Sequence, residues 1–528
     1  MKPLSSLLLA LALSLAACTP IQPQAATDPA LMYSGDAARP NPLEGPSEPV
    51  GDDAQPRTLL ADEPADDEAP SPSPIQNRFT TPRRGATAVL VADPPSPVEV
   101  VDRRELPELE VTVVELANGV EVWMKPTDFN EEQVAFAAIS PGGISLVDDE
   151  DVAEARLIST VVSRSGAGAV SQEELDALLE ERQVTLTPVL RELSDGMAGE
   201  AAPESLETLL QLVYLYFTAP HADPAVFDAV KAEELAWIEE RAGYPGDVMD
   251  DLVDDIFFSY NYRLTVLPPA AVEQLDLERA MAVYQDRFGD AGDFAFVFVG
   301  AFDVEELIEL AQVYLGNLPA AGREEQWQER VPGPPDGITI RKVYRGDSTE
   351  DAVAALGFAG PVDYNKQAEL ELSVLGAVLD EMVRWALRVN PNIYVSEAFT
   401  SMTERSEPWY QFWLYIQTQP ARMDEVTAQI FDLIDQLQSQ GPTERFLAAA
   451  KAKRLAHWEE QMADNIFWRE NLRLYALFGG EDKLEILQNY PAIIEGVTAR
   501  EVQQMAQEYL RPDRYINVVV NPEAAAPR

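Results

Sequence analysis

The stretch VTVVELANGVEVWM, residues 111–124, decides how the ordered part of this chain begins. Apolar and polar residues roughly alternate on both sides of Asn118-Gly119, a dipeptide that favours a two-residue hairpin turn. The pattern predicts two antiparallel strands. A third apolar run at 134–140 leads into the turn signal Pro141-Gly142-Gly143 and then into an acidic helix start at 148–151. The sequence therefore predicts a sheet first and helices after it.

The helices and closing strands of this unit recur about 220 residues later, which indicates an internal repeat. The matching segments are 206–217 with 423–437, 225–241 with 444–462, 279–288 with 500–510, and 294–299 with 515–520. Two copies of one unit predict an α+β fold of two homologous layered domains, each an antiparallel sheet with helices on one side. The predicted boundaries are 108–320 for the first domain, 321–335 for a Pro-rich linker, 336–522 for the second domain and 523–528 for a tail.

The N-terminal region predicts an anchor and a spacer. An apolar run at 7–13 precedes Ala16-Ala17-Cys18, the order expected of a lipoprotein signal peptide over residues 1–18, with Cys18 as the acylated residue. Thr19 after the cysteine favours the outer membrane of a Gram-negative cell, with the protein facing the periplasm. Residues 19–107 hold 17 of the 40 prolines together with acidic pieces, and we expect them to form a disordered tether.

Composition excludes several classes of function. The net charge of −51 argues against nucleic-acid binding. Cys18 is the only cysteine, so no internal disulfide can form. The two histidines, His221 and His457, lie too far apart in sequence to form a local metal motif, and imidazole is the usual metal ligand and general base of hydrolases. We therefore expect no bound metal in this chain and no peptidase activity from the chain alone.

The order of these segments resembles the pitrilysin/insulinase-type zinc peptidases. The resemblance covers roughly residues 109–522 and is closest to the C-terminal, non-zinc half of long periplasmic members. It rests on the hairpin, the Pro-Gly-Gly turn, the acidic helix start and the duplication, together with local stretches. These stretches are LANGVEVW at 116–123, YLYFTAP at 214–220 and FVGAFD at 298–303.

The resemblance implies where zinc chemistry would lie. Active members carry an inverted H-x-x-E-H on the first helix of the first domain, where two histidines hold zinc and the glutamate activates water. In this chain the ligand positions fall near Leu157 and Val161, and the glutamate position falls near Thr160. None of these side chains can replace the histidines or the glutamate. A third ligand, a glutamate, would come from the segment 231–241, where Glu239 and Glu240 have surface roles as the default expectation.

A second implied region lies in the last domain. Active members place an arginine and a tyrosine there to bind the substrate backbone and the developing oxyanion. Tyr394 falls on the family tyrosine, and Arg388 is the best candidate for the arginine, although Asn390-Pro391-Asn392 replaces the usual glycines. The alternative is structural: Arg388 ends an amphipathic helix and Tyr394 begins a strand. Both interpretations stay open at this point.

The resemblance implies a non-catalytic subunit of a heterodimeric periplasmic zinc peptidase. Its partner would be an H-x-x-E-H-bearing subunit that supplies the zinc, and its substrates would be peptides. The alternative is a peptide-binding or envelope-assembly scaffold lipoprotein without a peptidase partner. Self-association through the same surface is a third possibility.

Overall fold

The computed structural model describes residues 89–345, 351–387, 393–396, 398–403, 405, 407–479 and 486–526. The predicted signal peptide with Cys18, and the tether as far as residue 88, lie outside the described residues. The strands of the first half are β1 (Val100–Leu106), β2 (Val111–Leu116), β3 (Glu121–Pro126), β4 (Val134–Pro141), β5 (Val184–Leu190), β6 (Ser194–Ala201) and β7 (Ala295–Gly300). Its helices are α2 (Val152–Ser163), α3 (Gln172–Arg182), α4 (Leu206–Thr218), α5 (Pro224–Arg241), α6 (Pro245–Phe257), α7 (Pro269–Glu273), α8 (Leu277–Arg287) and α9 (Val304–Tyr314).

The second half repeats most of this order. Its strands are β8 (Ile338–Tyr344), β9 (Ala352–Pro361), β10 (Ile393–Val395), β11 (Phe399–Met402), β12 (Trp409–Thr418) and β13 (Tyr515–Asn521). Its helices are α10 (Lys366–Leu387), α11 (Met423–Gln440), α12 (Glu444–Gln461), α13 (Asn465–Phe478), α15 (Tyr490–Gly496) and α16 (Ala499–Tyr509). No helix in the described part of the chain is both long enough and apolar enough to cross a membrane.

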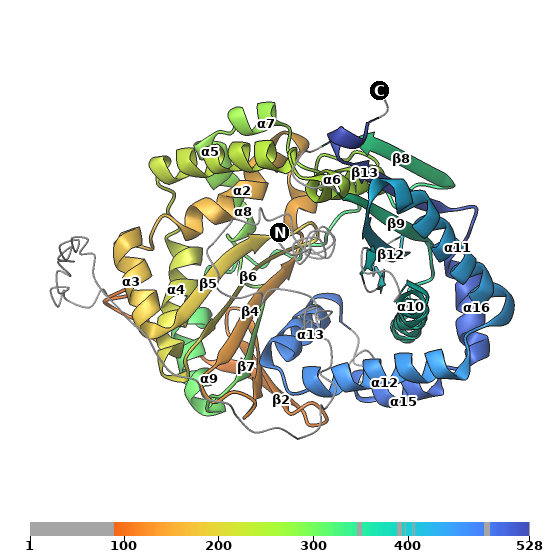
Figure 1. The fold of residues 1–528 in the computed structure, drawn as a ribbon. Coiled ribbons are helices and arrows are strands. Elements are labelled where there is room, and N and C mark those ends of the chain that lie inside the picture. Colours follow the sequence, from red (N-terminus) through yellow and green to blue (C-terminus); the bar gives the residue numbers. More distant parts are fainter. Residues whose placement is uncertain are drawn as a thin grey trace, which may run out of the picture. The chain divides into compact units, whose positions relative to one another are not determined.

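Sheet topology confirms the predicted α+β duplication. The first sheet runs β1-β2-β3-β7-β4-β6-β5, and the second runs β10-β12-β9-β13-β8 with β11 added on β12. The order β3-β7-β4-β6-β5 therefore corresponds to β8-β13-β9-β12-β10. Each sheet contains one parallel pair, β3 with β7 and β8 with β13, among otherwise antiparallel neighbours. Each parallel pair brings the closing strand of its repeat beside an early strand (Figure 1).

The predicted start of the ordered region at residue 108 is wrong. β1 pairs with β2 in antiparallel fashion, from Val100 opposite Leu116 to Leu106 opposite Val111. Residues before β1 are also held, because the backbone N–H of Val98 donates to the carbonyl oxygen of Gln312 at 3.0 Å. The sequence of β1 resembles that of a tether because β1 lies at the edge of the sheet, where its solvent-facing positions are mostly charged.

Each sheet is covered by helices of its own half on one face and by a helix of the other half on the opposite face. In each half, helices of the same half cover one face of the sheet, as predicted. The other face of each sheet is covered by a helix from the opposite half: α6 packs on β9 and β13, and α13 packs on β4 and β7 (Figure 1). The two helices hold equivalent places in the repeat, so each half completes the core of the other. Hydrophobic burial thus continues from one sheet to the next.

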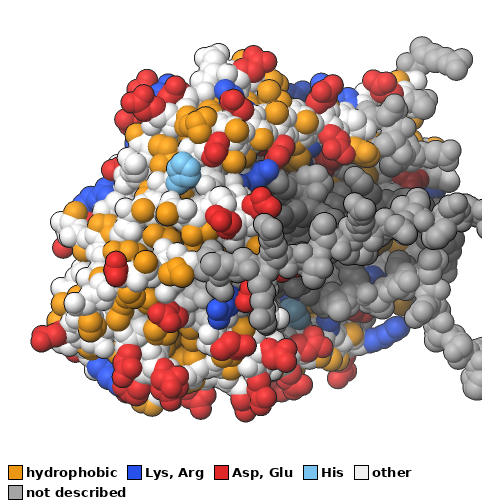
Figure 2. All heavy atoms as spheres, turned by 90° about the vertical axis from the view of Figure 1, so that its left-hand side faces the viewer, with side chains coloured by type: hydrophobic (Ala, Val, Ile, Leu, Met, Phe, Trp, Pro, Cys, Tyr) orange, Lys and Arg blue, Asp and Glu red, His pale blue; other side chains and the backbone are white. Residues whose placement is uncertain are grey.

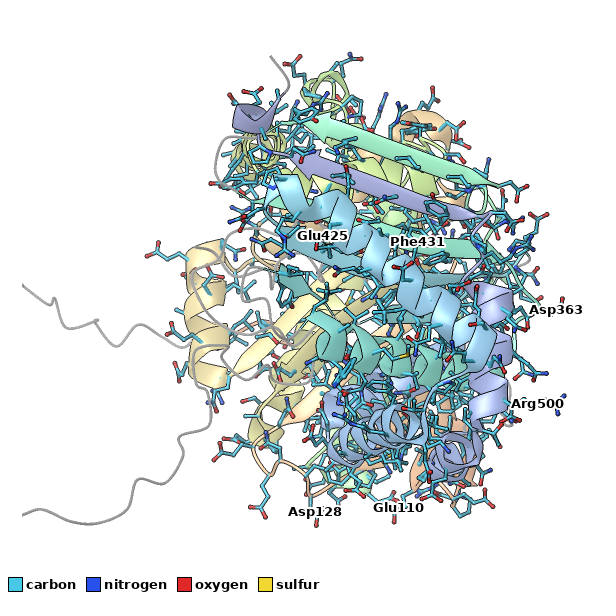
Figure 3. The ribbon with its side chains drawn as sticks, turned by 45° about the vertical axis from the view of Figure 1, so that its right-hand side comes forward. Glu110, Asp128, Asp363, Glu425, Phe431 and Arg500 are labelled. Carbon is cyan, nitrogen blue, oxygen red and sulfur yellow. The ribbon has the colours of Figure 1, made fainter. Side chains whose placement is uncertain are left out.

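The second sheet and its own helices are joined by aromatic packing. Phe431 of α11 lies over this sheet (Figure 3), with its ring centroid 5.1 Å from that of Tyr515 and 6.2 Å from that of Phe358. Strand β12, which is rich in aromatic residues, pairs with β9 along its whole length and is buried at nearly every position. Its aromatic residues therefore belong to the core rather than to a peptide-binding edge.

A largely buried charge cluster lies within α13. Glu470 accepts hydrogen bonds from Arg473 Nε and Nη2 at 2.9 and 2.6 Å, and from Arg469 Nε at 3.0 Å. Burial alone would raise the pKa of Glu470, but the two guanidinium groups dominate and lower it to about 2. The folded chain therefore favours the ionised form of the Glu470 carboxyl group.

The Glu470 carboxylate should stabilise the folded state most above pH 4.5. Its pKa is lower in the folded chain than the ordinary 4.5, so its contribution is present above 4.5 and is lost as the pH falls towards 2. We expect Glu470→Gln to reduce the free energy of unfolding at pH 7 by roughly 3 kcal/mol. Urea unfolding of both proteins from pH 7 to pH 3 measures this. A difference between the two proteins that does not narrow below pH 4.5 would contradict the assignment.

Candidate functional site

Helix α2 carries the three positions that the resemblance assigns to zinc chemistry. Leu157 and Val161 lie one turn apart on the same face of this helix, and both are buried in the core of the first half. Thr160 is half-buried beside them. Two apolar side chains in contact with a core add to its packing and supply no electron pair to a metal. The positions that the resemblance assigns to zinc ligands are therefore occupied by core side chains.

The segment expected to supply a third ligand contains a buried carboxylate that the sequence analysis missed. On α5, Glu239 and Glu240 are exposed, whereas Glu234 is only 4% exposed. Burial raises the pKa of Glu234, and the charges of Arg156 and Arg241 oppose that rise. A signal was present in the sequence, because Glu234 follows the buried residues Phe227 and Val230 at helical spacing.

Neither histidine lies on α2. His221 is exposed in the loop before α5. His457 lies on α12 with its Nδ1 3.9 Å from Glu460, a residue exposed on the same helix. Across the stretches that the structure describes, no group of three or more His, Cys, Asp or Glu side chains could hold a metal ion.

Of the predicted Arg/Tyr pair, the structure describes only the tyrosine. Arg388 lies outside the described residues. Tyr394 is on β10, a short strand that pairs with β12 through Tyr394 opposite Gln417, and β10 lies at the edge of the sheet. Its side chain is 37% exposed. An exposed tyrosine on an edge strand is open to a ligand, so both interpretations of this residue still hold.

The fold is that of a peptidase-like domain, with apolar side chains at the α2 positions that the resemblance assigns to zinc ligands. The family described as "Peptidase M16 inactive domain" matches residues 274–454. The chain is 24% identical over 408 residues to "Zinc protease PQQL-like" of Arabidopsis thaliana, covering 72% of this chain and 39% of the relative. It is 19% identical over 411 residues to "Probable zinc protease PqqL" of Haemophilus influenzae, covering 76% of this chain and 43% of the relative.

Solved structures show the same fold. The periplasmic protease PqqL from Escherichia coli superposes with a TM-score of 0.68 at 17% identity, covering 83% of this chain and 48% of that one. A peptidase M16 inactive domain from Pseudomonas fluorescens superposes with a TM-score of 0.63 at 16% identity, covering 80% of this chain and 100% of that one. The predicted resemblance to the inactive half of pitrilysin/insulinase-type zinc peptidases is thereby confirmed. This chain spans less than half the length of the PqqL relatives that it matches.

Proposed function

We propose that this protein is the non-catalytic subunit of a periplasmic, heterodimeric zinc peptidase, in which it helps to bind peptide substrate and completes the chamber. The observation that supports the proposal is that Leu157 and Val161, at the positions that the resemblance assigns to zinc ligands, are buried apolar residues of α2. A fold that is kept while its metal ligands are lost is best suited to binding and assembly.

A partner with H-x-x-E-H would supply what this chain lacks. The PqqL chains are about twice as long as the part matched here, and this chain corresponds to one half of them. Zinc would be bound by the partner alone, so no cofactor is assigned to this chain. The partner's water-activating glutamate and this chain's exposed Tyr394 would then act on one bound peptide.

Location follows from the same proposal. The relative from Escherichia coli is a periplasmic protease. A periplasmic site for this chain agrees with the predicted signal peptide and with acylation at Cys18, which would anchor it to the outer membrane. Mass spectrometry of the membrane-extracted protein tests the acylation directly.

Isolation of the chain from its own membrane tests the assembly. We expect an H-x-x-E-H-bearing chain to come along in equal amount, and zinc to follow that chain rather than this one. A chain purified alone that holds one equivalent of tight zinc would contradict the proposal. Recovery with an envelope complex that contains no peptidase would favour the scaffold alternative.

Tyr394→Phe should lower peptide turnover by the mixed complex by about a hundredfold, because removal of one oxyanion donor commonly has an effect of this size. Assembly and substrate affinity should change little, since the phenyl ring keeps the packing. Turnover and gel filtration of the complex measure the two effects. Tyr260→Phe, at another exposed tyrosine, is the matched control. Unchanged turnover in Tyr394→Phe would leave this tyrosine with a structural role only.

A further inference from the structure

Strand β8 is the last strand of the second sheet, and one of its edges is open (Figure 1). The other edge pairs in parallel with β13. The carbonyl oxygen of Gly337, just before β8, accepts from the N–H of Tyr515 at 3.1 Å. The N–H of Arg345, just after β8, donates to the carbonyl oxygen of Asn521 at 2.9 Å. Because peptide groups alternate in direction along a strand, the odd-numbered residues of β8 face β13, and the even-numbered ones direct their N–H and C=O groups to the open edge.

Two isoleucines lie along this open edge with their side chains exposed. Ile338 is 53% exposed and Ile340 is 58% exposed. Their side chains share the sheet face that α11 covers, because Lys342, two residues further along, pairs with Asp424 of α11 at 3.2 Å. The open edge of β8 therefore presents unpaired peptide groups together with apolar surface.

The internal repeat shows what the same edge is like when it is covered. Strand β8 corresponds to β3 in the first sheet. Val122 of β3 is the counterpart of Ile340, because each lies opposite the third residue of the aligned segments that contain β7 and β13. Val122 is 0% exposed, and so is Val120, the counterpart of Ile338. Positions that are fully buried in the first half are thus exposed in the second.

Two elements cover these valines in the first half. Strand β2 pairs with β3 in antiparallel fashion, with Val114 opposite Val122, and the N–H of Leu116 donates to the carbonyl oxygen of Val120 at 2.9 Å. Helix α9 contacts both β2 and β3. Among the described residues, no strand takes the place of β2 beside β8, and no helix packs on β8 as α9 packs on β3. The second half therefore presents an edge to which a further strand can be added.

The charge of β8 selects the kind of strand that fits. Acidic side chains are spread over the face shown in Figure 2, and the net charge of the chain is −51. In contrast, β8 contains Arg341 and Lys342 and no acidic residue, and Arg345 follows it. Lys342 is paired with Asp424, whereas Arg341 and Arg345 form no ion pair within the described part of the chain. A second copy of β8 would bring like charges together, which is unfavourable.

We propose that the open edge of β8 binds an extended segment of another protein, in which aliphatic and acidic residues alternate, as an added strand antiparallel to β8. Peptide groups of the segment would pair with those of Ile338 and Ile340, as β2 pairs with β3. Its aliphatic side chains would cover the two isoleucines, and its acidic side chains would lie on the opposite face beside Arg341. Tyr394 is on β10, at the other edge of the same sheet, so this interaction goes beyond the proposed peptidase role and can fail without it.

Fluorescence anisotropy of two labelled, acetylated heptapeptides with the full-length protein tests the proposal. One peptide alternates valine and glutamate, and the other alternates valine and lysine. We expect the glutamate peptide alone to bind, and Ile340→Glu and Arg341→Glu each to weaken its binding by about tenfold. Val101→Glu is the matched control, since Val101 is 57% exposed on the edge strand β1, and it should leave the affinity unchanged. Equal binding of the two peptides, or full affinity in Ile340→Glu, would overturn the proposal.

Methylation of peptide nitrogens tests the strand pairing without any change to the protein. In an antiparallel pair the valines opposite Ile338 and Ile340 direct their N–H groups to β8, and the glutamates direct theirs away. Methylation of the valine nitrogens should therefore abolish binding, whereas methylation of the glutamate nitrogens should preserve it. Equal effects of the two patterns would overturn the added strand. Ultracentrifugation that shows a dimer of the protein which Ile340→Glu separates would also overturn it, because a second copy would then occupy the edge.

Discussion

A chain shortened to begin at residue 108 should lose roughly 3 to 6 kcal/mol of folding free energy, whereas one that begins at Val89 should unfold like the full-length protein. The shorter chain lacks β1 and the segment before it. Each hydrogen bond of the β1–β2 ladder contributes about 1 kcal/mol net, and removal of β1 turns the apolar strand β2 into an exposed edge. Urea unfolding followed by circular dichroism measures the difference.

The segment before β1 adds to this loss. Leu90 is buried in the core of the first half, and Gln312 Nε2 donates to the carbonyl oxygen of Val98 at 2.6 Å. Asn317 donates in the same way to Ser96 at 2.9 Å. The chain that begins at Val89 keeps all three contacts, so it is the control. Equal stability of the two shortened chains would show that β1 contributes nothing and would restore the boundary at residue 108.

The duplication could be predicted because it leaves a periodic signal in both copies. Helices with an apolar face and strands such as β7 and β13 are recognisable from local sequence alone. Strand β6 is hard to predict because its sequence, SDGMAGEA, contains few residues with strand propensity. Its pairing explains the composition: a Cβ at Gly196 would lie 2.3 Å from the carbonyl oxygen of Ala138, and one at Gly199 would lie 2.0 Å from that of Thr185. Glycine is required at these two positions because neighbouring backbones approach closely, and strand propensity does not report such a contact.

The packing of α6 on the second sheet, and of α13 on the first sheet, could not be predicted either. An amphipathic helix shows that one of its faces is buried, but the pattern does not say which sheet buries it. The zinc-motif positions assigned to α2 stay a prediction, which depends only on the order of elements within one half.

Arg405 illustrates a contact between the halves that sequence alone does not reveal. It is buried, with Nη1 2.8 Å from Glu192 Oε1 and 2.9 Å from Glu329 Oε1, and it also forms an ion pair with Glu192 through Nη2. Its guanidinium carbon lies 4.5 Å from the ring centroid of Trp409. One side chain of the second half thus joins the turn between β5 and β6 to the segment that connects the two halves.

Arg405→Met should lower the free energy of unfolding by roughly 3 to 5 kcal/mol, because it leaves two carboxylates near each other in a buried place without their cation. Adding Glu192→Gln to this variant should restore part of the loss, since one of the uncompensated charges is then gone. Arg511→Met is the matched control: Arg511 is exposed and pairs with Asp513 at 2.8 Å, so its loss should change the free energy of unfolding far less than the loss of Arg405. Urea unfolding of the four proteins measures these values.

If the halves depend on Arg405 for their contact, the Arg405→Met variant should also unfold in two steps, since the second sheet and the first would no longer form one cooperative unit. A loss as small as that of Arg511→Met would mean that hydrophobic packing of α6 and α13 alone holds the halves together.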